Sequence, residues 1–459
     1  MGFFEDVEKN GKEIILGRIC KILEKNPEKN VKKLFSTAKL LSKDKDSKNI
    51  LEKIEDYYNN NTVIKEEIND ILKNTDSKYL QCFFKNFLAN AIWSGIPKRK
   101  KYMEKENVKI PFTILLSPSM RCNLHCTGCY AADYSKESGL TFEEVDKIVG
   151  DGRNLGVNYF VILGGEPFFV DYMFDIYKKY NDVLFTPFTN GTLFNEEVAD
   201  KLLSLGNVIP MFSLEGFEKE TDNRRGKGTF RKVMKGMDLL KERGIPFGVS
   251  SAVSTYNMET VSSDKFIDML IEKGSRMSWY FIYMPVGDKP NVKDMLKPQQ
   301  RIELGRRARN IRSTKPYFTI DFFNDAPYVG GCIAGKYYCH INSNGDVEPC
   351  IFAHISVDNV KDKSLIDIFR GELFTELRKR QPYNDNMLMP CMMIDNPNVI
   401  REVAESVKAH PTEASADAML NDKDFQEELD KLSEKFKPYA DEAWEKDFGS
   451  KGNDSFSKG

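Results

Sequence analysis

Residues 111–130 read PFTILLSPSMRCNLHCTGCY, a short apolar run followed at once by three cysteines. The apolar run predicts a buried β-strand, the first of a sheet. Cys122, Cys126 and Cys129 then follow with the spacing C-x3-C-x2-C. The spacing places three thiolates on a loop short enough to curl around one centre, so the loop can hold three corners of a cubane iron–sulfur cluster.

Three thiolates leave one position of such a centre without a protein ligand. Iron–sulfur clusters usually take four thiolates, and an open metal position is more typical of a catalytic site than of a structural one. A zinc knuckle completed by His125 or a distant cysteine is the alternative. The spacing and the position after a strand favour iron–sulfur.

Short apolar runs alternate with helical segments downstream of this loop. Thr141 and Glu144, for example, stand at capping-box spacing and predict the start of a helix. Apolar strands that alternate with helices predict a parallel sheet covered by helices, here a partial (βα)6 barrel with its active site at the carboxyl ends of the strands. The six predicted strands are residues 111–117, 158–164, 183–190, 208–214, 246–253 and 279–286.

A C-x3-C-x2-C loop after the first strand of such a domain resembles the signature of the radical S-adenosylmethionine (SAM) superfamily. CNLHCTGCY is similar to the subgroup with a C-terminal SPASM or twitch extension, and the resemblance covers about residues 110–400. It implies a [4Fe-4S] cluster on Cys122, Cys126 and Cys129, whose open iron is chelated by SAM. It further implies reductive cleavage of SAM to a 5′-deoxyadenosyl radical that abstracts hydrogen from a substrate.

The same resemblance implies SAM contacts at the strand ends. Many members carry an aromatic residue just before the third cysteine, where this chain has Gly128. Ordinary turns, and a surface salt bridge for the arginine, are the alternatives to these contacts. The candidate SAM-binding residues are Tyr130, Gly164, Gly165, Glu166, Pro167, Asn190, Ser213 and Arg225.

A second group of cysteines begins at residue 331 with GCIAGKYYCHINSNGDVEPC. Asn344-Gly345 predicts a hairpin turn, which would bring Cys332 and Cys350 together. The pattern resembles the opening of a SPASM or twitch domain, and its few downstream cysteines favour a single auxiliary [4Fe-4S] cluster. The candidate ligands are Cys332, Cys339, Cys350 and Cys391.

Two alternatives remain for this second group. Cys339 is either the fourth ligand, which is the preferred interpretation, or a half-buried strand residue. A structural zinc site on the four cysteines is the other possibility.

The sequence predicts four regions. Residues 1–105 form a helical region with a docking or a packing role, residues 106–315 the barrel, and residues 316–400 a small Cys-rich α+β extension. Residues 401–459 form a helical tail, which is acidic because residues 411–459 contain 13 acidic and 7 basic side chains.

Composition and charge bound the function. The net charge of −2 over 459 residues gives no general attraction to nucleic acid. No run reaches the roughly 18 apolar residues of a membrane span. The first residues, MGFFEDVEKN, lack the pattern of a signal peptide, so a cytoplasmic location is expected.

The resemblance therefore implies a radical SAM oxidoreductase or maturase. Its substrate is unidentified and could be a peptide, a cofactor precursor, a carbohydrate or a lipid. Its partners would be SAM and an electron donor such as flavodoxin or ferredoxin. The alternative is an iron–sulfur redox or metal-sensing protein that does not turn over SAM.

Overall fold

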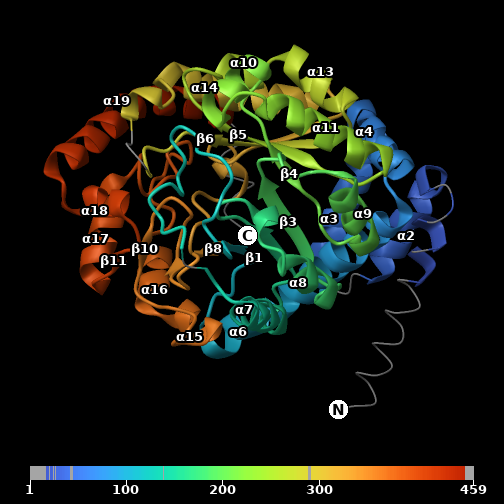
Figure 1. Cartoon of the computed structure of the whole chain (residues 1–459), viewed down its shortest axis with the longest axis horizontal. Coiled ribbons are helices and arrows are strands. Elements are labelled where there is room, and N and C mark those ends of the chain that lie inside the picture. The colour runs from blue at the N-terminus through green and yellow to red at the C-terminus, as the bar shows by residue number, and fades with distance from the viewer. Residues whose placement is uncertain are drawn as a thin grey trace.

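A twisted sheet surrounded by helices forms the centre of the molecule in the computed structural model (Figure 1). The structure describes residues 17–19, 21–23, 25, 27–41, 45–137, 139–287 and 291–449, and the first ten residues, on which the expected lack of a signal peptide rests, lie outside them. Within these ranges the sheet has nine strands in the order β7-β6-β5-β4-β3-β2-β1-β8-β9. The strands are β1 Thr113–Leu116, β2 Tyr159–Ile162, β3 Leu184–Thr189, β4 Met211–Ser213, β5 Gly248–Val253, β6 Met277–Ile282, β7 Phe318–Asp321, β8 Tyr338–Ile341 and β9 Val347–Glu348.

Within this described sheet, all neighbouring strands from β7 to β8 pair in parallel, and β8 and β9 pair antiparallel. Each of the six predicted strands is present as one of β1 to β6, so the parallel α/β sheet is confirmed. A seventh strand, β7, extends this sheet at the β6 edge. β1, which leads into the first cysteine loop, lies inside the sheet between β2 and β8.

Helices cover the outer face of the sheet. Thr141 and Glu144 form the predicted capping box at the start of α7, with both of its hydrogen bonds present. The helices of this part are α7 Phe142–Leu155, η3 Pro167–Phe169, α8 Met173–Lys179, α9 Glu196–Leu205, α10 Glu218–Arg225, α11 Thr229–Glu242, α12 Met258–Val261, α13 Asp264–Glu272, η4 Val292–Asp294, α14 Pro298–Thr314 and η5 Ala326–Tyr328. Phe160, Phe185 and Phe212 of adjacent strands are fully buried, and burying each stabilises the fold by about 1.5–3 kcal/mol.

The N-terminal region is helical, as the sequence predicts, and packs against the amino ends of the strands. Its elements are η1 Pro27–Asn30, α2 Val31–Leu41, α3 Lys45–Asn60, α4 Thr62–Asn74, α5 Ser77–Cys82, η2 Phe83–Ser94 and α6 Gly95–Glu106, of which η2 is a π-helix. Asn86 and Asn90 on η2 donate hydrogen bonds to the backbone carbonyls of residues 181–183, just before β3. These hydrogen bonds attach η2 to the sheet, and the helices α2 to α4 lie on one side of the molecule (Figure 1).

The C-terminal part occupies the opposite side of the molecule (Figure 1). It contains α15 Leu365–Arg370, α16 Glu372–Arg380, α17 Pro397–Val407, α18 Ala414–Asn421 and α19 Lys423–Phe448, and a two-stranded sheet of β10 Ile355–Ser356 and β11 His410–Pro411. The predicted hairpin at Asn344-Gly345 is present between β8 and β9, and Gly345 has φ 93°. No helix among the described residues is both long and apolar enough to cross a membrane.

Candidate functional site

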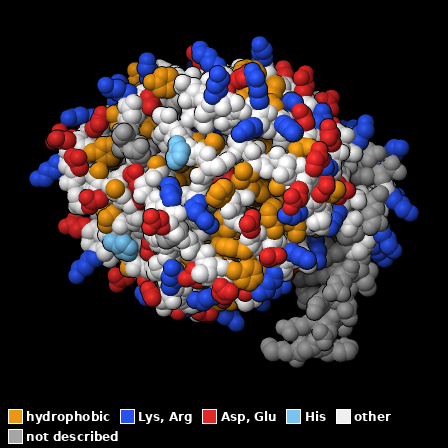
Figure 2. Space-filling model, viewed as in Figure 1, with side chains coloured by type: hydrophobic (Ala, Val, Ile, Leu, Met, Phe, Trp, Pro, Cys, Tyr) orange, Lys and Arg blue, Asp and Glu red, His pale blue; other side chains and the backbone are white. Residues whose placement is uncertain are grey.

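The first cysteine loop leaves β1 at its carboxyl end and borders a large cavity. Cys122, Cys126 and Cys129 are half-buried and all line a space of about 1390 Å³ inside the barrel. The structure therefore brings the three predicted cysteines to one side of an enclosed volume, at the end of the sheet where the fold predicts a site. Hydrophobic side chains gather near the middle of the face in Figure 2, and charged side chains are frequent around them.

Two glycines fix the path of this loop. The backbone N–H groups of Gly165 and Glu166 donate hydrogen bonds of 2.9 Å to the carbonyls of Ser119 and Arg121. A Cβ on Gly164 would collide with the Ser119 carbonyl, and one on Gly165 with the Arg121 carbonyl. Only glycine allows two backbone segments to approach so closely, so the Gly164-Gly165 turn holds the cysteine loop in place.

A buried charge cluster holds the other end of the loop. Glu215 is 1% exposed and pairs with both Arg224 and Arg225 at 2.6 Å. Arg224 also donates to the carbonyls of Thr127 and Gly128 at 3.1 Å. Burial alone would raise the pKa of Glu215, but the two arginines outweigh it and lower the pKa, so the carboxylate is ionised.

Burial and nearby arginines set the pKa of two thiols of this loop, those of Cys122 and Cys126. Burial raises the pKa of Cys122 and of Cys126, and Arg225 opposes the rise at Cys126. Arg225 Nη1 lies 4.0 Å from Cys126 Sγ, and Asn190 Nδ2 lies 3.7 Å from Cys122 Sγ. The raised pKa favours the protonated thiols of Cys122 and Cys126, and metal binding would displace their protons.

Most of the candidate SAM-binding residues border the cavity beside the cysteines. These are Tyr130, Gly164, Gly165, Asn190, Ser213 and Arg225. Glu166 and Pro167 are buried behind them and do not line the cavity. Glu166 accepts hydrogen bonds from Thr189 Oγ1 and Asn190 N, both at 2.7 Å. Burial raises the pKa of Glu166 to about 7 in spite of these donors.

The second cysteine group converges in part. Cys332, Cys350 and Cys391 all lie close enough to the ring hydroxyls of Tyr338 and Tyr383 to raise their pKa, with burial as the larger cause. Tyr338 donates a hydrogen bond of 3.0 Å to Cys350 Sγ. Burial raises the pKa of Cys332 to about 12.

Cys339 does not join these three. It follows Tyr338 on β8, and successive side chains of a strand point to opposite faces of the sheet. Since Tyr338 faces the other thiols, Cys339 faces away, and it is fully buried opposite Ile114 of β1. Its pKa is raised by burial alone, without any contribution from another cysteine. The placement is that of an apolar core residue.

The ligand geometry distinguishes the two kinds of metal site. Among the described residues, no three His, Cys, Asp or Glu side chains converge as the ligands of a single ion do. A structural zinc site requires four ligands around one ion, whereas a cubane binds each thiolate to a different iron. Because cysteine thiolates are the usual ligands of iron–sulfur clusters, the residues of both groups suit such clusters.

Sequence reasoning missed a buried polar network that joins the two cysteine regions. Tyr134 OH lies 2.7 Å from Glu348 Oε1 and 2.6 Å from His354 Nδ1. His340 contacts Ser117 Oγ at 2.7 Å and Glu348 Oε2 at 2.6 Å, so both of its ring nitrogens have partners. Except for the His340–Glu348 pair, these partners are more than 200 residues apart in the sequence, so no local sequence pattern predicts the contacts.

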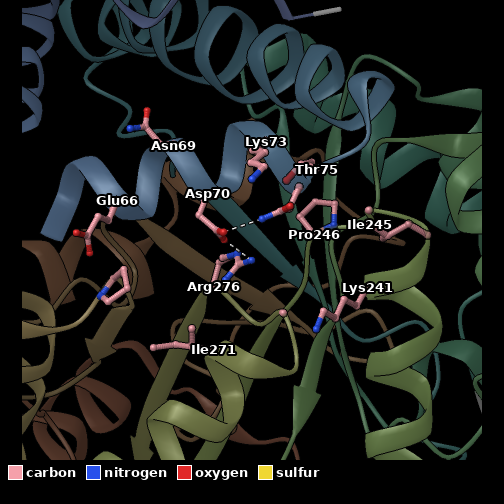
Figure 3. Close-up of a pocket in the computed structure, with 14 residues that line it drawn as sticks. Glu66, Asn69, Asp70, Lys73, Thr75, Lys241, Ile245, Pro246, Ile271 and Arg276 are labelled. Carbon is pink, nitrogen blue, oxygen red and sulfur yellow. Dashed lines mark hydrogen bonds and ion pairs between the residues drawn. The ribbon is translucent and has the colours of Figure 1, made fainter. Parts of the chain in front are cut away.

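A second pocket, of about 720 Å³, lies between α4 and the turns that precede β5 and β6 (Figure 3). Asp70 on α4 forms an ion pair with Arg276 across it and accepts a hydrogen bond of 2.6 Å from Asn74. Acidic and basic side chains share its walls and no cysteine lines it. It is a polar seam between the N-terminal helices and the barrel.

Known families match the two cysteine regions. Residues 116–270 match the Radical SAM superfamily, and residues 332–393 match SPASM, an iron–sulfur cluster-binding domain. The first match contains the cysteines that line the barrel cavity, and the second contains Cys332, Cys339, Cys350 and Cys391.

Curated relatives and solved structures agree with these matches. The AdoMet-dependent heme synthase of Methanosarcina barkeri is 26% identical over 288 residues, which cover 56% of this chain and 82% of the relative. The mycofactocin maturase MftC of Mycolicibacterium smegmatis is 25% identical over 305 residues, 62% of this chain and 77% of the relative. Streptococcus suis SuiB bound to S-adenosylmethionine shares the fold with a TM-score of 0.55 at 20% identity, over 65% of this chain and 76% of SuiB.

Proposed function

We propose that this chain, a radical SAM enzyme with a SPASM iron–sulfur domain, binds its SAM-cleaving [4Fe-4S] cluster through Cys122, Cys126 and Cys129. The radical SAM domain binds a [4Fe-4S] cluster and SAM, and the SPASM domain binds an iron–sulfur cluster. When bound and reduced, the first cluster supplies the electron that cleaves SAM so that hydrogen can be taken from a substrate. The observation that carries the proposal is that all three cysteines line one enclosed cavity.

The residues beside the cysteines bind SAM in this proposal. Gly164 and Gly165 present backbone to the cavity, and Asn190 and Ser213 present neutral hydrogen-bonding groups. Tyr130 provides an aromatic surface between the cysteine loop and the cavity. Glu166 and Pro167 stand behind this wall, where Glu166 ties the ends of β2 and β3 together through Thr189 and Asn190.

Arg225 divides its role between two partners. Its guanidinium is committed to Glu215 but still borders the cavity, 4.0 Å from Cys126 Sγ. We expect its positive charge to stabilise the anionic thiolates and a carboxylate of SAM beside them.

The auxiliary cluster of the SPASM domain is held by Cys332, Cys350 and Cys391 in our proposal. Their shared proximity to Tyr338 and Tyr383 supports this set, and the opposite orientation of Cys339 favours leaving Cys339 out of it. The cluster then has a position without a cysteine from the described residues, which is available to a non-cysteine ligand or to substrate.

Two further parts of the proposal concern partners and location. The electron reaches the cluster from a small redox protein of the flavodoxin or ferredoxin type, and the protein acts in the cytoplasm. With a net charge of −2, the chain has no general electrostatic attraction to nucleic acid. The relatives are named for heme synthesis and mycofactocin maturation, so their names do not point to one substrate.

The test is release of 5′-deoxyadenosine by anaerobically reconstituted, reduced protein given SAM. We expect slow release by the wild type and none by Cys126→Ala. The matched control is Cys339→Ala, which should retain release because Cys339 lies away from both cysteine groups. An iron–sulfur spectrum with SAM bound but no release, with or without substrate candidates, would instead favour a redox or sensing protein.

A further inference from the structure

The cavity is larger and deeper than a SAM site requires. Its volume of about 1390 Å³ exceeds the roughly 300–1,000 Å³ of ordinary small-molecule pockets. Its lining includes the first residues of seven strands: Thr113, Tyr159, Leu184, Met211, Met277, Phe318 and Tyr338. The cavity therefore runs the length of the strands, roughly 20 Å for six residues, from the cysteine loop to the opposite end of the barrel.

Charge is confined to one end of this cavity. The charged lining side chains all come from loops and helices that follow the carboxyl ends of strands: Arg121, Asp133, Lys136, Arg224, Arg225 and Asp294. The described residues that line the inner half are almost all apolar or aromatic. A ligand group with a formal charge would lose its hydration there without gaining a partner, so the inner half selects an uncharged ligand.

Two residues of the cavity wall carry a buried, neutral polar atom. Trp279 Nε1 and Ser251 Oγ belong to residues that line the cavity, and both are buried without a hydrogen-bond partner. Buried donors of this kind normally pair. Since both atoms are closed off from water, they lie behind the cavity surface and leave that surface apolar.

The amino-terminal end of the cavity has an aromatic rim. Phe318 at the start of β7 is 48% exposed and Phe83 on η2 is 37% exposed, and both line the cavity. Phe87 stacks on Phe83 with ring centroids 5.2 Å apart and meets Phe112 edge-on at 6.0 Å. Exposed phenylalanines on a cavity wall mark an opening through which an apolar chain can pass.

We propose that the substrate carries a long aliphatic hydrocarbon chain, of the acyl, alkyl or isoprenoid type, that lies along the barrel between the cysteine loop and the rim formed by Phe83 and Phe318. This inference rests on the proposed function, since it takes the cysteine end of the cavity as the place of reaction. A tetrapyrrole with several carboxylates is disfavoured, because the inner half of the cavity has no cation among the described residues to pair with them.

The experiment measures binding without catalysis. Tritium-labelled 1-octanol, 1-dodecanol and 1-hexadecanol are equilibrated by dialysis against anaerobically reconstituted, unreduced protein. Burial of each methylene corresponds to about a fourfold gain in affinity, so we expect the dissociation constant to fall at least about tenfold with each four added carbons. Coproporphyrin III serves as the charged, flat competitor and should not displace hexadecanol.

Rim variants separate the cavity from nonspecific adsorption. Phe318→Glu and Phe83→Glu place a carboxylate at the opening and should each weaken hexadecanol binding at least about fivefold. Ile96→Glu is the control, because Ile96 is 44% exposed on α6 and does not line the cavity. Two rim positions on different elements are tested so that misfolding of one variant does not leave the question open.

Three results would overturn the inference: affinity independent of chain length, equal effects of the rim and Ile96 variants, or displacement of hexadecanol by coproporphyrin III. Release of 5′-deoxyadenosine is assayed on the same preparations. Release of 5′-deoxyadenosine without binding of the alcohols would reject the hydrocarbon substrate and retain the proposed function. Length-dependent binding of the alcohols without release would retain the hydrocarbon site and reject the proposed function.

Discussion

Gly165 supports the cysteine loop by having no side chain. A Cβ there would meet the carbonyl oxygens of Met120, at 2.6 Å, and of Arg121, and both are backbone atoms that cannot turn aside. We expect Gly165→Ala to destabilise the fold by about 1–3 kcal/mol through overpacking. Because the loop must move, the reconstituted protein should lose about half of its iron as two cubane sites become one. Iron per chain and the melting temperature measure the two effects.

Gly17→Ala is the control for this variant. A Cβ at Gly17 meets none of the described residues within 4 Å, so neither iron content nor stability should fall. Full iron occupancy in Gly165→Ala would show that the turn does not position the cysteine loop.

Glu215 is the buried counter-charge for two half-buried arginines. Its replacement by glutamine leaves Arg224 and Arg225 without their anion, and breaking a buried pair in this way typically costs about 3–5 kcal/mol. The midpoint of denaturant unfolding should fall accordingly. Glu218→Gln is the control, on the helix α10 that carries Arg224 and Arg225. Its pair with Arg231 is exposed, and surface pairs contribute only about 0–1 kcal/mol. Equal midpoints for the two variants would contradict this account.

The spacing of residues decides what the sequence could predict at this scale. Cys122, Cys126 and Cys129 are eight residues from first to last, so their common orientation follows from the loop alone. Arg225 was predicted to contact SAM, but its pairing with Glu215, and the support that Arg224 gives to the loop, depend on the turn between β4 and α10. Such pairings are set by tertiary packing and leave no local pattern.

Glu67 makes the attachment of α4 sensitive to pH. Burial raises the pKa of Glu67 to about 7, against the opposing effects of Arg276 and a backbone hydrogen bond from Phe318. The fold therefore favours the neutral carboxyl, and its stabilising effect is complete below the unfolded pKa of about 4.3 and is lost as the pH rises through 7. We expect Glu67→Gln to be more stable than the wild type at pH 8, with the difference disappearing toward pH 4.5.

Melting temperatures of the two proteins between pH 4.5 and pH 8 check this prediction. Glu66→Gln is the control, since Glu66 directly precedes Glu67 in the helix and is exposed. A difference between Glu67→Gln and the wild type that does not change over this range would show that the pKa of Glu67 is the same in the folded and the unfolded protein.

Strands and helices with strong local patterns were predictable, and those defined by their neighbours were not. Six apolar runs gave β1 to β6, and Thr141 with Glu144 gave the start of α7. β7 has only four residues, of which Phe318 is exposed, so its pattern is too short to stand out. β8 was foreseen as part of a hairpin, but its parallel pairing with β1 depends on residues more than 200 positions apart. The same pairing directs the Cys339 side chain toward the hydrophobic core.

At the scale of the whole molecule, the C-terminal helix is connected to the second cysteine group through the barrel helix α14. The Phe436 ring of α19 lies 4.1 Å from the guanidinium carbon of Arg301 on α14. Arg301 forms a buried ion pair with Asp395 at 2.5 Å, and Asp395 accepts a hydrogen bond of 2.9 Å from the backbone N–H of Cys391. The acidic tail is therefore part of the support for Cys391, although the sequence alone indicates only a polar helix.

Phe436→Ala tests this connection. Removing a buried phenylalanine side chain costs about 3–5 kcal/mol, and the loss frees the guanidinium that positions Asp395. In a background of Cys122→Ala, Cys126→Ala and Cys129→Ala, the remaining iron reports on the auxiliary site alone. We expect Phe436→Ala to speed release of this iron to a chelator several-fold. Tyr439→Ala, at a 37% exposed position of the same helix, should leave the rate unchanged. If both substitutions leave it unchanged, α19 does not support the auxiliary cluster, and Cys391 must be held by its own loop.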